Sequence, residues 1–202
     1  MVVASKLNYV EEGLKLKSNL LSHFKNLMQR LQEHNYTTYQ HSIRVGSLLA
    51  ELGFRLGFSI EKIETLYLVG ILHDIGKIKV SNDILNKKGK LTHREWEELK
   101  RHVQYGVELL NDLPISDEVV EAISGHHENE DGSGYPYGLD SNTISLYAKM
   151  VRIVDSYDAM IDNRPYRNGL SKETAIQELQ KGAGKIYEPH LVHSFCQMIT
   201  NR

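Results

Sequence analysis

The stretch around which the chain is organised runs His126-His127-Glu128-Asn129-Glu130-Asp131-Gly132-Ser133-Gly134-Tyr135-Pro136. It places two adjacent imidazoles and several carboxylates directly before a turn that contains glycine and proline. A second histidine–carboxylate pair, His73-Asp74, stands well upstream, and Asp155 follows downstream in an apolar run. Imidazole and carboxylate groups together suit divalent transition metals such as iron, manganese or zinc. The sequence therefore predicts a hydrolytic metal site.

The residues on either side of this stretch show helical patterns. Apolar residues recur every three or four positions, and Ser, Thr or Pro stands where several helices should begin. No segment shows sustained two-residue alternation, so we predict an all-α domain. The expected helices run from Thr38 to Leu56, from Ser59 toward Ile75, from the capping box Thr92-His93-Arg94-Glu95 through Leu110, from Ser116 to near His126, from Ile144 to Ile161, from Ser171 to Gly182 or Gly184, and from Pro189 onward.

Three polar, glycine-containing segments are the expected loops. The longest is 128–143, and the shorter two are Lys87-Lys88-Gly89-Lys90 and 163–169.

The first 35 residues show a separate pattern, in which apolar side chains recur at alternating steps of three and four residues. Such spacing is typical of a coiled-coil or dimer-facing helix, which would make the protein a homodimer. A helix packed on its own domain explains the pattern equally well, and both interpretations stay open. The residues that form the pattern are Leu7, Val10, Leu14, Leu21, Phe24, Met28 and Leu31.

Composition narrows the class of protein. The 202 residues are 41% hydrophobic and 25% charged, with a net charge of −2, so no basic surface for duplex nucleic acid is expected. No apolar run approaches the roughly 20 residues of a membrane span, and no signal-peptide core is present at the N-terminus. The single cysteine, Cys196, has no partner for an intramolecular disulfide. We therefore expect a cytoplasmic protein.

Asp74 is the residue best suited to join two metal ions. Because neighbouring residues on a helix point about 100° apart, His73 and Asp74 serve two ions, or one ion that other helices also bind. A carboxylate has two oxygens and is a natural bridge between metals about 3.5–4 Å apart. Two such ions that share a hydroxide provide a nucleophile at neutral pH and neutralise phosphate oxygens.

The other candidate ligands lie within or at the ends of predicted helices. Taken singly, histidines of this kind are more often satisfied core or surface residues than ligands, and their company favours ligation. A lone carboxylate in apolar surroundings is costly, and a metal partner offsets that cost. These candidates are His41, His102, His126, His127 and Asp155.

Local cations are available for an anionic substrate. Lys77 follows His73 by one helical turn, and Arg164 and Arg167 offer forked donors for a phosphate. The alternatives are a solvated helix-end charge for Lys77 and a solvated loop face for the arginines. Glu128 and Asp131 are expected to order the glycine-rich turn by hydrogen bonds.

These residues, in this order, resemble the HD-GYP family of the HD superfamily of metal-dependent phosphohydrolases. The resemblance rests on His73-Asp74-Ile75-Gly76-Lys77, on His102 with Gly106, on the full 126–136 stretch, on Arg152-Ile153-Val154-Asp155 with Asp158-Ala159-Met160, and on Arg164-Pro165-Tyr166-Arg167. It implies a helical-bundle catalytic domain over 36–202. It also implies hydrolysis of cyclic di-GMP to the linear dinucleotide, in some members onward to GMP, with iron or manganese as cofactor.

The resemblance also implies roles for individual residues. The metal ligands would be His41, His73, Asp74, His102, His126, His127 and Asp155, with Asp74 as the bridge. Catalysis would involve Asp74 and Lys77. Lys77, Asp158, Arg164 and Arg167 would contact substrate phosphates or order the site. Gly134, Tyr135 and Pro136 would shape the loop beside it and are a candidate docking point for a protein partner.

One position departs from the family pattern. Members with three metals have a glutamate four residues before the first histidine, where this chain has Thr37. A hydroxyl is a poor substitute for a carboxylate ligand, so we predict two divalent ions. Two other functions remain open: a catalytically idle module that binds the dinucleotide or a partner, and a phosphohydrolase of another nucleotide.

Overall fold

This computed structural model is a succession of helices, and the structure describes residues 20–163 and 168–202. No strand occurs in those ranges, which confirms the all-α prediction. Residues 20–34 are helical. They are followed by α2 (Tyr36–Arg55), α3 (Ile60–Leu72), the 3₁₀ helix η1 (Ile75–Lys79), α4 (Asn82–Leu85), α5 (His93–Lys100), α6 (His102–Leu110), α7 (Asp117–Gly125), α8 (Leu146–Ile161), α9 (Lys172–Gly182) and α10 (Pro189–Thr200).

The predicted helix starts agree with the structure because the capping chemistry is local. Ser59 and Ser171 each accept a hydrogen bond from a backbone N–H of the first turn. Thr92 and Glu95 form both halves of a capping box, and Pro189 is the first residue of α10. These side chains satisfy N–H groups that a helix leaves without partners.

Several helix boundaries differ from the predicted ones, and two of these differences have a clear local cause. The helix expected from Thr92 through Leu110 is divided at Arg101 into α5 and α6, and the His102 ring donates to the Leu99 carbonyl at the break. The helix expected to start at Thr38 begins at Tyr36, because the Asn35 side chain caps it and accepts from the Thr38 N–H. In both cases a polar side chain outweighs the apolar pattern.

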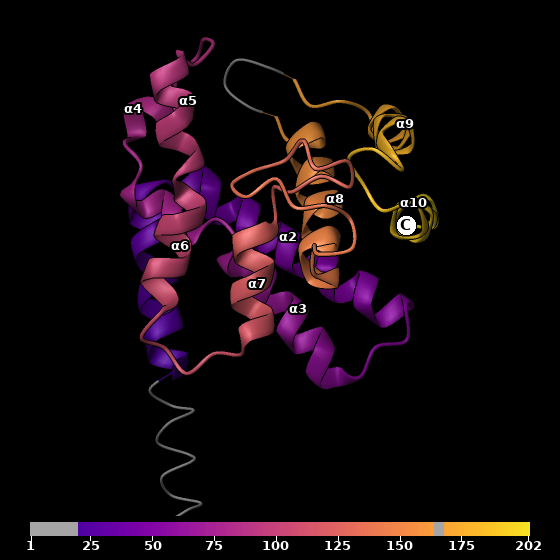
Figure 1. Cartoon of the computed structure of the whole chain (residues 1–202), viewed down its shortest axis with the longest axis horizontal. Coiled ribbons are helices and arrows are strands. Elements are labelled where there is room, and N and C mark those ends of the chain that lie inside the picture. The colour runs from indigo at the N-terminus through magenta and orange to yellow at the C-terminus, as the bar shows by residue number, and fades with distance from the viewer. Residues whose placement is uncertain (1–19, 164–167) are drawn as a thin grey trace, which may run out of the picture.

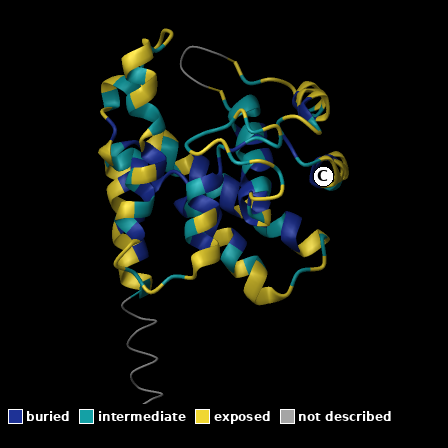
Figure 2. Cartoon of the chain, viewed as in Figure 1, coloured by how far each residue is buried: buried dark blue, intermediate teal, exposed yellow. Residues whose placement is uncertain are grey.

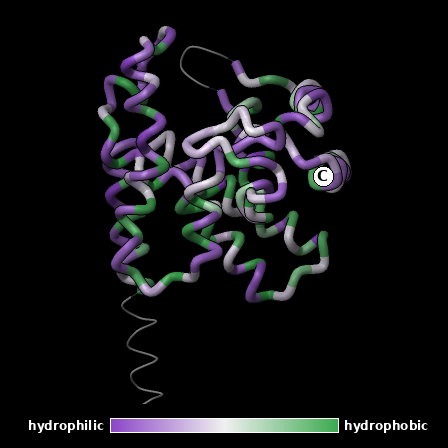
Figure 3. The backbone as a smooth tube through the Cα atoms, viewed as in Figure 1, coloured by the Kyte–Doolittle hydropathy of each residue, from purple (hydrophilic) through white to green (hydrophobic). Residues whose placement is uncertain are grey.

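The core lies where α2, α3, α7 and α8 meet, with α9 and α10 against α8 (Figure 1). Figure 2 shows buried residues gathered at this junction and exposed residues on the outer helix faces. Along the helices, apolar and hydrophilic segments alternate, as amphipathic helices require (Figure 3). Fully buried side chains come from distant parts of the chain, among them Leu52, Leu66, Ile123, Met150 and Phe195.

The helix of residues 20–34 packs on this same core. Phe24, Met28 and Leu31 are buried in it, while Leu21 is 55% exposed. The described part of the N-terminal segment therefore contributes to the domain and shares its core. Leu7, Val10 and Leu14 lie outside the described residues, and the homodimer stays a prediction.

Within the described ranges, every helix is too short or too polar to cross a lipid bilayer.

Candidate metal centre

All seven side chains predicted as ligands come together in the fold. They form two groups, and in each group one ligand atom per residue lies within 4.8 Å of the others. The first group has Asp74, His102, His126 and His127; the second has His41, His73 and Asp155. The elements that supply them are α2, the ends of α3 and α7, the starts of η1 and α6, and α8.

Three of these histidines are oriented by the same hydrogen bond. His73, His102 and His126 each place Nδ1 at 2.6–2.7 Å from the carbonyl oxygen three residues earlier, of Gly70, Leu99 and Ile123 respectively. A carbonyl only accepts, so Nδ1 carries the proton and Nε2 keeps a lone pair. Each ring also satisfies a carbonyl at the end of a helix, where no backbone partner is available.

The lone pairs that result face one another. The Nε2 atoms of His102 and His126 are 3.3 Å apart, and neither has a proton to share. Burial lowers the pKa of His102 to about 4 and that of His126 to about 3, so both rings are neutral at neutral pH. Among the described residues, His73 Nε2 and Asp74 Oδ1 are buried without a hydrogen-bond partner. Facing acceptors of this kind fit a cation between them.

Asp74 lies between the two groups and turns one oxygen toward each. Its Oδ1 is 3.4 Å from His102 Nε2, and its Oδ2 is 3.4 Å from His73 Nε2 and 3.7 Å from His41 Nε2. Lys77 Nζ donates to Oδ2 at 2.6 Å. Burial opposes ionisation, but the nearby charge of Lys77 holds the pKa of Asp74 well below its usual range. Asp74 is therefore ionised and placed to bind on both sides.

His41 is held by carboxylates. Its Nδ1 donates to Asp158 at 2.7 Å, and its Nε2 lies 3.0 Å from Asp155. Burial by itself lowers the pKa of His41, but the hydrogen bonds to Asp155 and Asp158 outweigh it and raise the pKa to about 9. The protonated, positively charged form of the His41 ring is thus strongly favoured.

Arg44, which the sequence interpretation missed, holds the Asp158 carboxylate by hydrogen bonds. Its Nε and Nη2 donate to the two carboxylate oxygens, each at 2.8 Å. Arg44 stands three residues after His41, so the two share one face of α2, and that spacing was the available signal. Buried between His41 and Arg44, Asp158 orders the site rather than facing a substrate.

The loop 128–143 is held against the cluster by Glu128. This buried carboxylate accepts from the backbone N–H groups of Tyr137, Gly138 and Leu139, as expected of a loop-ordering residue. A Cβ on Gly134 would lie 2.4 Å from the Cα of Glu128, so only glycine permits this close approach. The Tyr135–Pro136 bond is cis.

Tyr135 supports the remaining ligand. Its ring stacks on His127 with centroids 4.6 Å apart, and Trp96 meets it edge-on at 6.0 Å. Gly134 therefore lies against the backbone at Glu128, and Tyr135 lies against His127 of the candidate ligand cluster.

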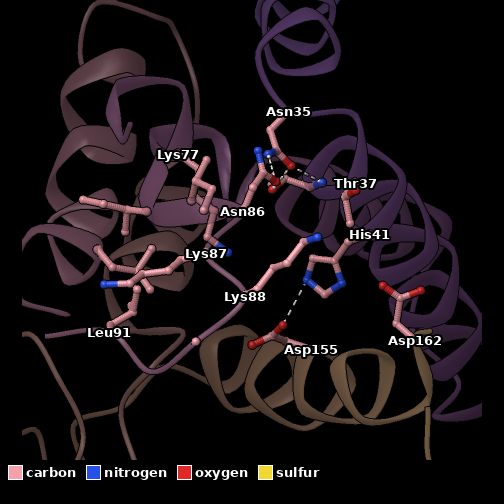
Figure 4. Close-up of a pocket in the computed structure, with 15 residues that line it drawn as sticks. Asn35, Thr37, His41, Lys77, Asn86, Lys87, Lys88, Leu91, Asp155 and Asp162 are labelled. Atoms are coloured by element: carbon pink, nitrogen blue, oxygen red, sulfur yellow. Dashed lines mark hydrogen bonds and ion pairs between the residues drawn. The ribbon is translucent and has the colours of Figure 1, made fainter. Parts of the chain in front are cut away.

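A pocket of about 430 Å³ opens beside the second ligand group, within the usual range for small-molecule sites (Figure 4). His41, Asp155 and Lys77 line it, together with Thr37 and residues of the 86–91 segment. Arg164 and Arg167 lie outside the described residues.

Comparison with known proteins gives a consistent family match. The model of a family described as HD domain matches residues 18–191. The chain is 36% identical over 187 residues to a cyclic di-GMP phosphodiesterase of Pseudomonas aeruginosa, covering 91% of this chain and 45% of that protein. It is 35% identical over 182 residues to a cyclic di-GMP phosphodiesterase of Thermotoga maritima, covering 89% of this chain and 47% of that protein. The chain thus spans about half the length of these relatives.

The fold also resembles solved structures. One is described as a cyclic GMP-AMP specific phosphodiesterase of V. cholerae; it has a TM-score of 0.66 and 18% identity, with 87% of this chain and 47% of that chain covered. At this identity the likeness shows a common helical fold.

Proposed function

This chain belongs to the HD domain family, in agreement with the HD-GYP resemblance. From this premise we propose that it is a metal-dependent phosphodiesterase that hydrolyses cyclic di-GMP to the linear dinucleotide. Relatives with that name align with nearly the whole chain. We assign the activity of those longer proteins to this chain because it contains the ligand cluster.

The observation that carries the proposal is the place of Asp74 between two ligand groups. Imidazole and carboxylate donors at such positions fit two divalent ions, iron or manganese. When bound, such a pair offsets the negative charge of a phosphodiester and lowers the pKa of a water molecule. A third ligand group would require a carboxylate where Thr37 stands, so we assign two ions per chain. Elemental analysis of protein purified without chelators checks this number, and three ions per chain would refute it.

The other side chains bind the substrate or position the ligands. Lys77 lines the pocket and donates to Asp74, so its ammonium group is placed to approach a phosphate oxygen beside the ligand groups. We assign Arg164 and Arg167 to the same substrate from the sequence. Asp158 positions His41, and Tyr135 positions His127.

The direct test is incubation of manganese- or iron-loaded protein with cyclic di-GMP and chromatographic detection of linear product. Asp74→Ala removes the group shared by both ligand sets, and we expect a loss of at least about a hundredfold, beyond the effect of removing an outer partner of a ligand. Asp83→Ala, which removes an exposed carboxylate on α4, is the control. Turnover that survives Asp74→Ala would refute the mechanism.

A second candidate is hydrolysis of a different cyclic dinucleotide. A Vibrio cholerae relative named 3′3′-cGAMP-specific phosphodiesterase 2, 32% identical over 169 residues, favours it. A substrate panel with cyclic di-GMP, cyclic GMP-AMP and cyclic di-AMP, compared by kcat/KM, separates the two functions. Tight binding without turnover in every metal would instead indicate a catalytically idle module.

Three further expectations remain proposals. The free, buried thiol of Cys196 supports a reducing, cytoplasmic location. A homodimer through the N-terminal segment and a protein partner at Gly134-Tyr135-Pro136 are testable by light scattering and by pull-down with variants of that loop.

A further inference from the structure

The segment between α4 and α5 forms one wall of the pocket beside the metal centre. Asn86, Lys87, Lys88, Gly89 and Leu91 line this wall, and His41 and Asp155 line the pocket opposite. Figure 4 shows the Lys88 side chain extended into the space of the pocket. A single pocket therefore contains part of the candidate metal centre and two adjacent basic residues, Lys87 and Lys88.

The three pocket lysines differ in what they already bind. Lys77 Nζ donates to Asp74 at 2.6 Å. Lys87 Nζ donates to both oxygens of Glu95, at 2.8 and 2.6 Å. Within the described residues, Lys88 is the pocket lysine without such a carboxylate partner. Its positive charge is free to bind an anion.

The neighbouring ion pair ties the backbone next to Lys88 to the start of α5. Glu95 belongs to the capping box of α5 and also accepts from the backbone N–H and the hydroxyl of Thr92. Because Lys87 is tied to this fixed carboxylate, the backbone at Lys88 is anchored on one side. Lys90, two residues on, is exposed like Lys88 but does not line the pocket.

The proposed substrate supplies the matching anion. A cyclic dinucleotide has two phosphodiester groups on opposite sides of its ring, each with one negative charge. Ions held by the ligand groups would neutralise the phosphodiester that is cleaved, which leaves the other phosphodiester to be neutralised by the rest of the pocket. Ile84, Leu85, Leu91 and Leu99 also line the pocket and offer apolar contact to the nucleosides.

We propose that Lys88 binds the phosphodiester that is not cleaved and thereby favours substrates with two phosphates over those with one. This inference rests on the proposed function and names a specificity residue for it. Lys88 strengthens binding of substrate and transition state alike, because it does not touch the reacting atoms. It should therefore affect KM and leave kcat unchanged.

The test compares Lys88→Ala with Lys90→Ala, a matched loss of one charge from the same segment. With cyclic di-GMP and manganese-loaded protein, we expect KM to rise about fivefold for Lys88→Ala, the upper range for an exposed ion pair, with kcat unchanged. Lys88→Arg should restore KM, and Lys90→Ala should match the wild type. With bis(p-nitrophenyl) phosphate, which has a single phosphodiester, Lys88→Ala should match the wild type.

Two results would overturn the inference while the proposed function stands: equal KM values for the two alanine variants, or an equal loss on the single-phosphate probe. If the wild type does not turn over cyclic di-GMP, the proposed function fails separately. Calorimetric Kd values for the cyclic dinucleotide then decide the role of Lys88. About fivefold weaker binding for Lys88→Ala supports it, and unchanged or absent binding refutes it.

Discussion

At two helix ends in this molecule, a histidine ring both satisfies a helix carbonyl and serves as a candidate metal ligand. The last turn of a helix has carbonyls without backbone donors, and a metal ligand needs a fixed ring with a free nitrogen. His73 and His126 follow the ends of α3 and α7, and each donates Nδ1–H back to a carbonyl of that helix. The same bond that terminates the helix therefore aims Nε2 at the cluster.

His41 lies inside α2 and depends on Asp158 instead. We predict that Asp158→Asn lowers affinity for manganese by roughly ten- to a hundredfold, because the ring loses the anionic acceptor that orients it. Asp162→Asn is the control, since Asp162 pairs with Arg44 at 3.1 Å without touching His41. Chelator competition gives both affinities, and an equal loss in the two variants would contradict the role of Asp158.

At this scale the sequence predicted which residues gather but not how each is oriented. The types and order of the seven candidate ligands were sufficient to predict that they gather. The proton positions on His73, His102 and His126 depend on carbonyls placed by helix ends, and the boundary at Arg101 was not visible in the apolar pattern. Arg44 was missed because one arginine on an amphipathic helix is usually solvated.

Among the elements, η1 and α6 approach each other unusually closely. A Cβ on Gly76 would lie 1.9 Å from the His102 carbonyl oxygen and 2.4 Å from the Gly106 nitrogen. This contact brings Asp74, at the start of η1, opposite His102. The glycine in the His73–Lys77 motif is thus required by backbone packing.

We predict that Gly76→Ala lowers the free energy of unfolding by about 2 kcal/mol or more, because backbone atoms cannot yield to the added methyl group. Denaturant unfolding measures the loss. Gly89→Ala, where an added Cβ meets nothing within 4 Å, should change stability little. A Gly76→Ala variant as stable as the Gly89→Ala variant would show that η1 and α6 do not pack this closely.

The 128–143 loop depends on one buried carboxylate. Glu128→Ala leaves the N–H groups of Tyr137, Gly138 and Leu139 without their acceptor, which costs roughly 1–3 kcal/mol locally. We expect faster hydrogen exchange over residues 128–143. Glu121→Ala, on the exposed face of α7, is the control. Unchanged exchange in the loop would mean that other contacts hold it.

Across the whole molecule, the N-terminal segment shows a limit of sequence interpretation. A stripe of apolar residues every three or four positions specifies a buried helix face but not the partner that buries it. Phe24, Met28 and Leu31 meet the core of their own domain, although their spacing equally suited a coiled coil. The all-α class was predictable because it depends only on the period of the pattern.

The candidate metal centre joins helices from α2, with His41, to α8, with Asp155. The apolar core contains few ligand atoms, so the metal-free protein should remain folded.

Ions that bind only the folded state add about 2.7 kcal/mol to the free energy of unfolding at a concentration of 100 times Kd. For a domain of this size we predict that manganese raises Tm by roughly 5–10 °C over chelator-treated protein. Magnesium should raise it less, because it prefers oxygen ligands and the site is rich in imidazole. Scanning fluorimetry checks both shifts. An equal manganese shift in the Asp74→Ala variant would show that the ions bind elsewhere, since that variant lacks the only carboxylate shared by the two ligand groups of the described residues.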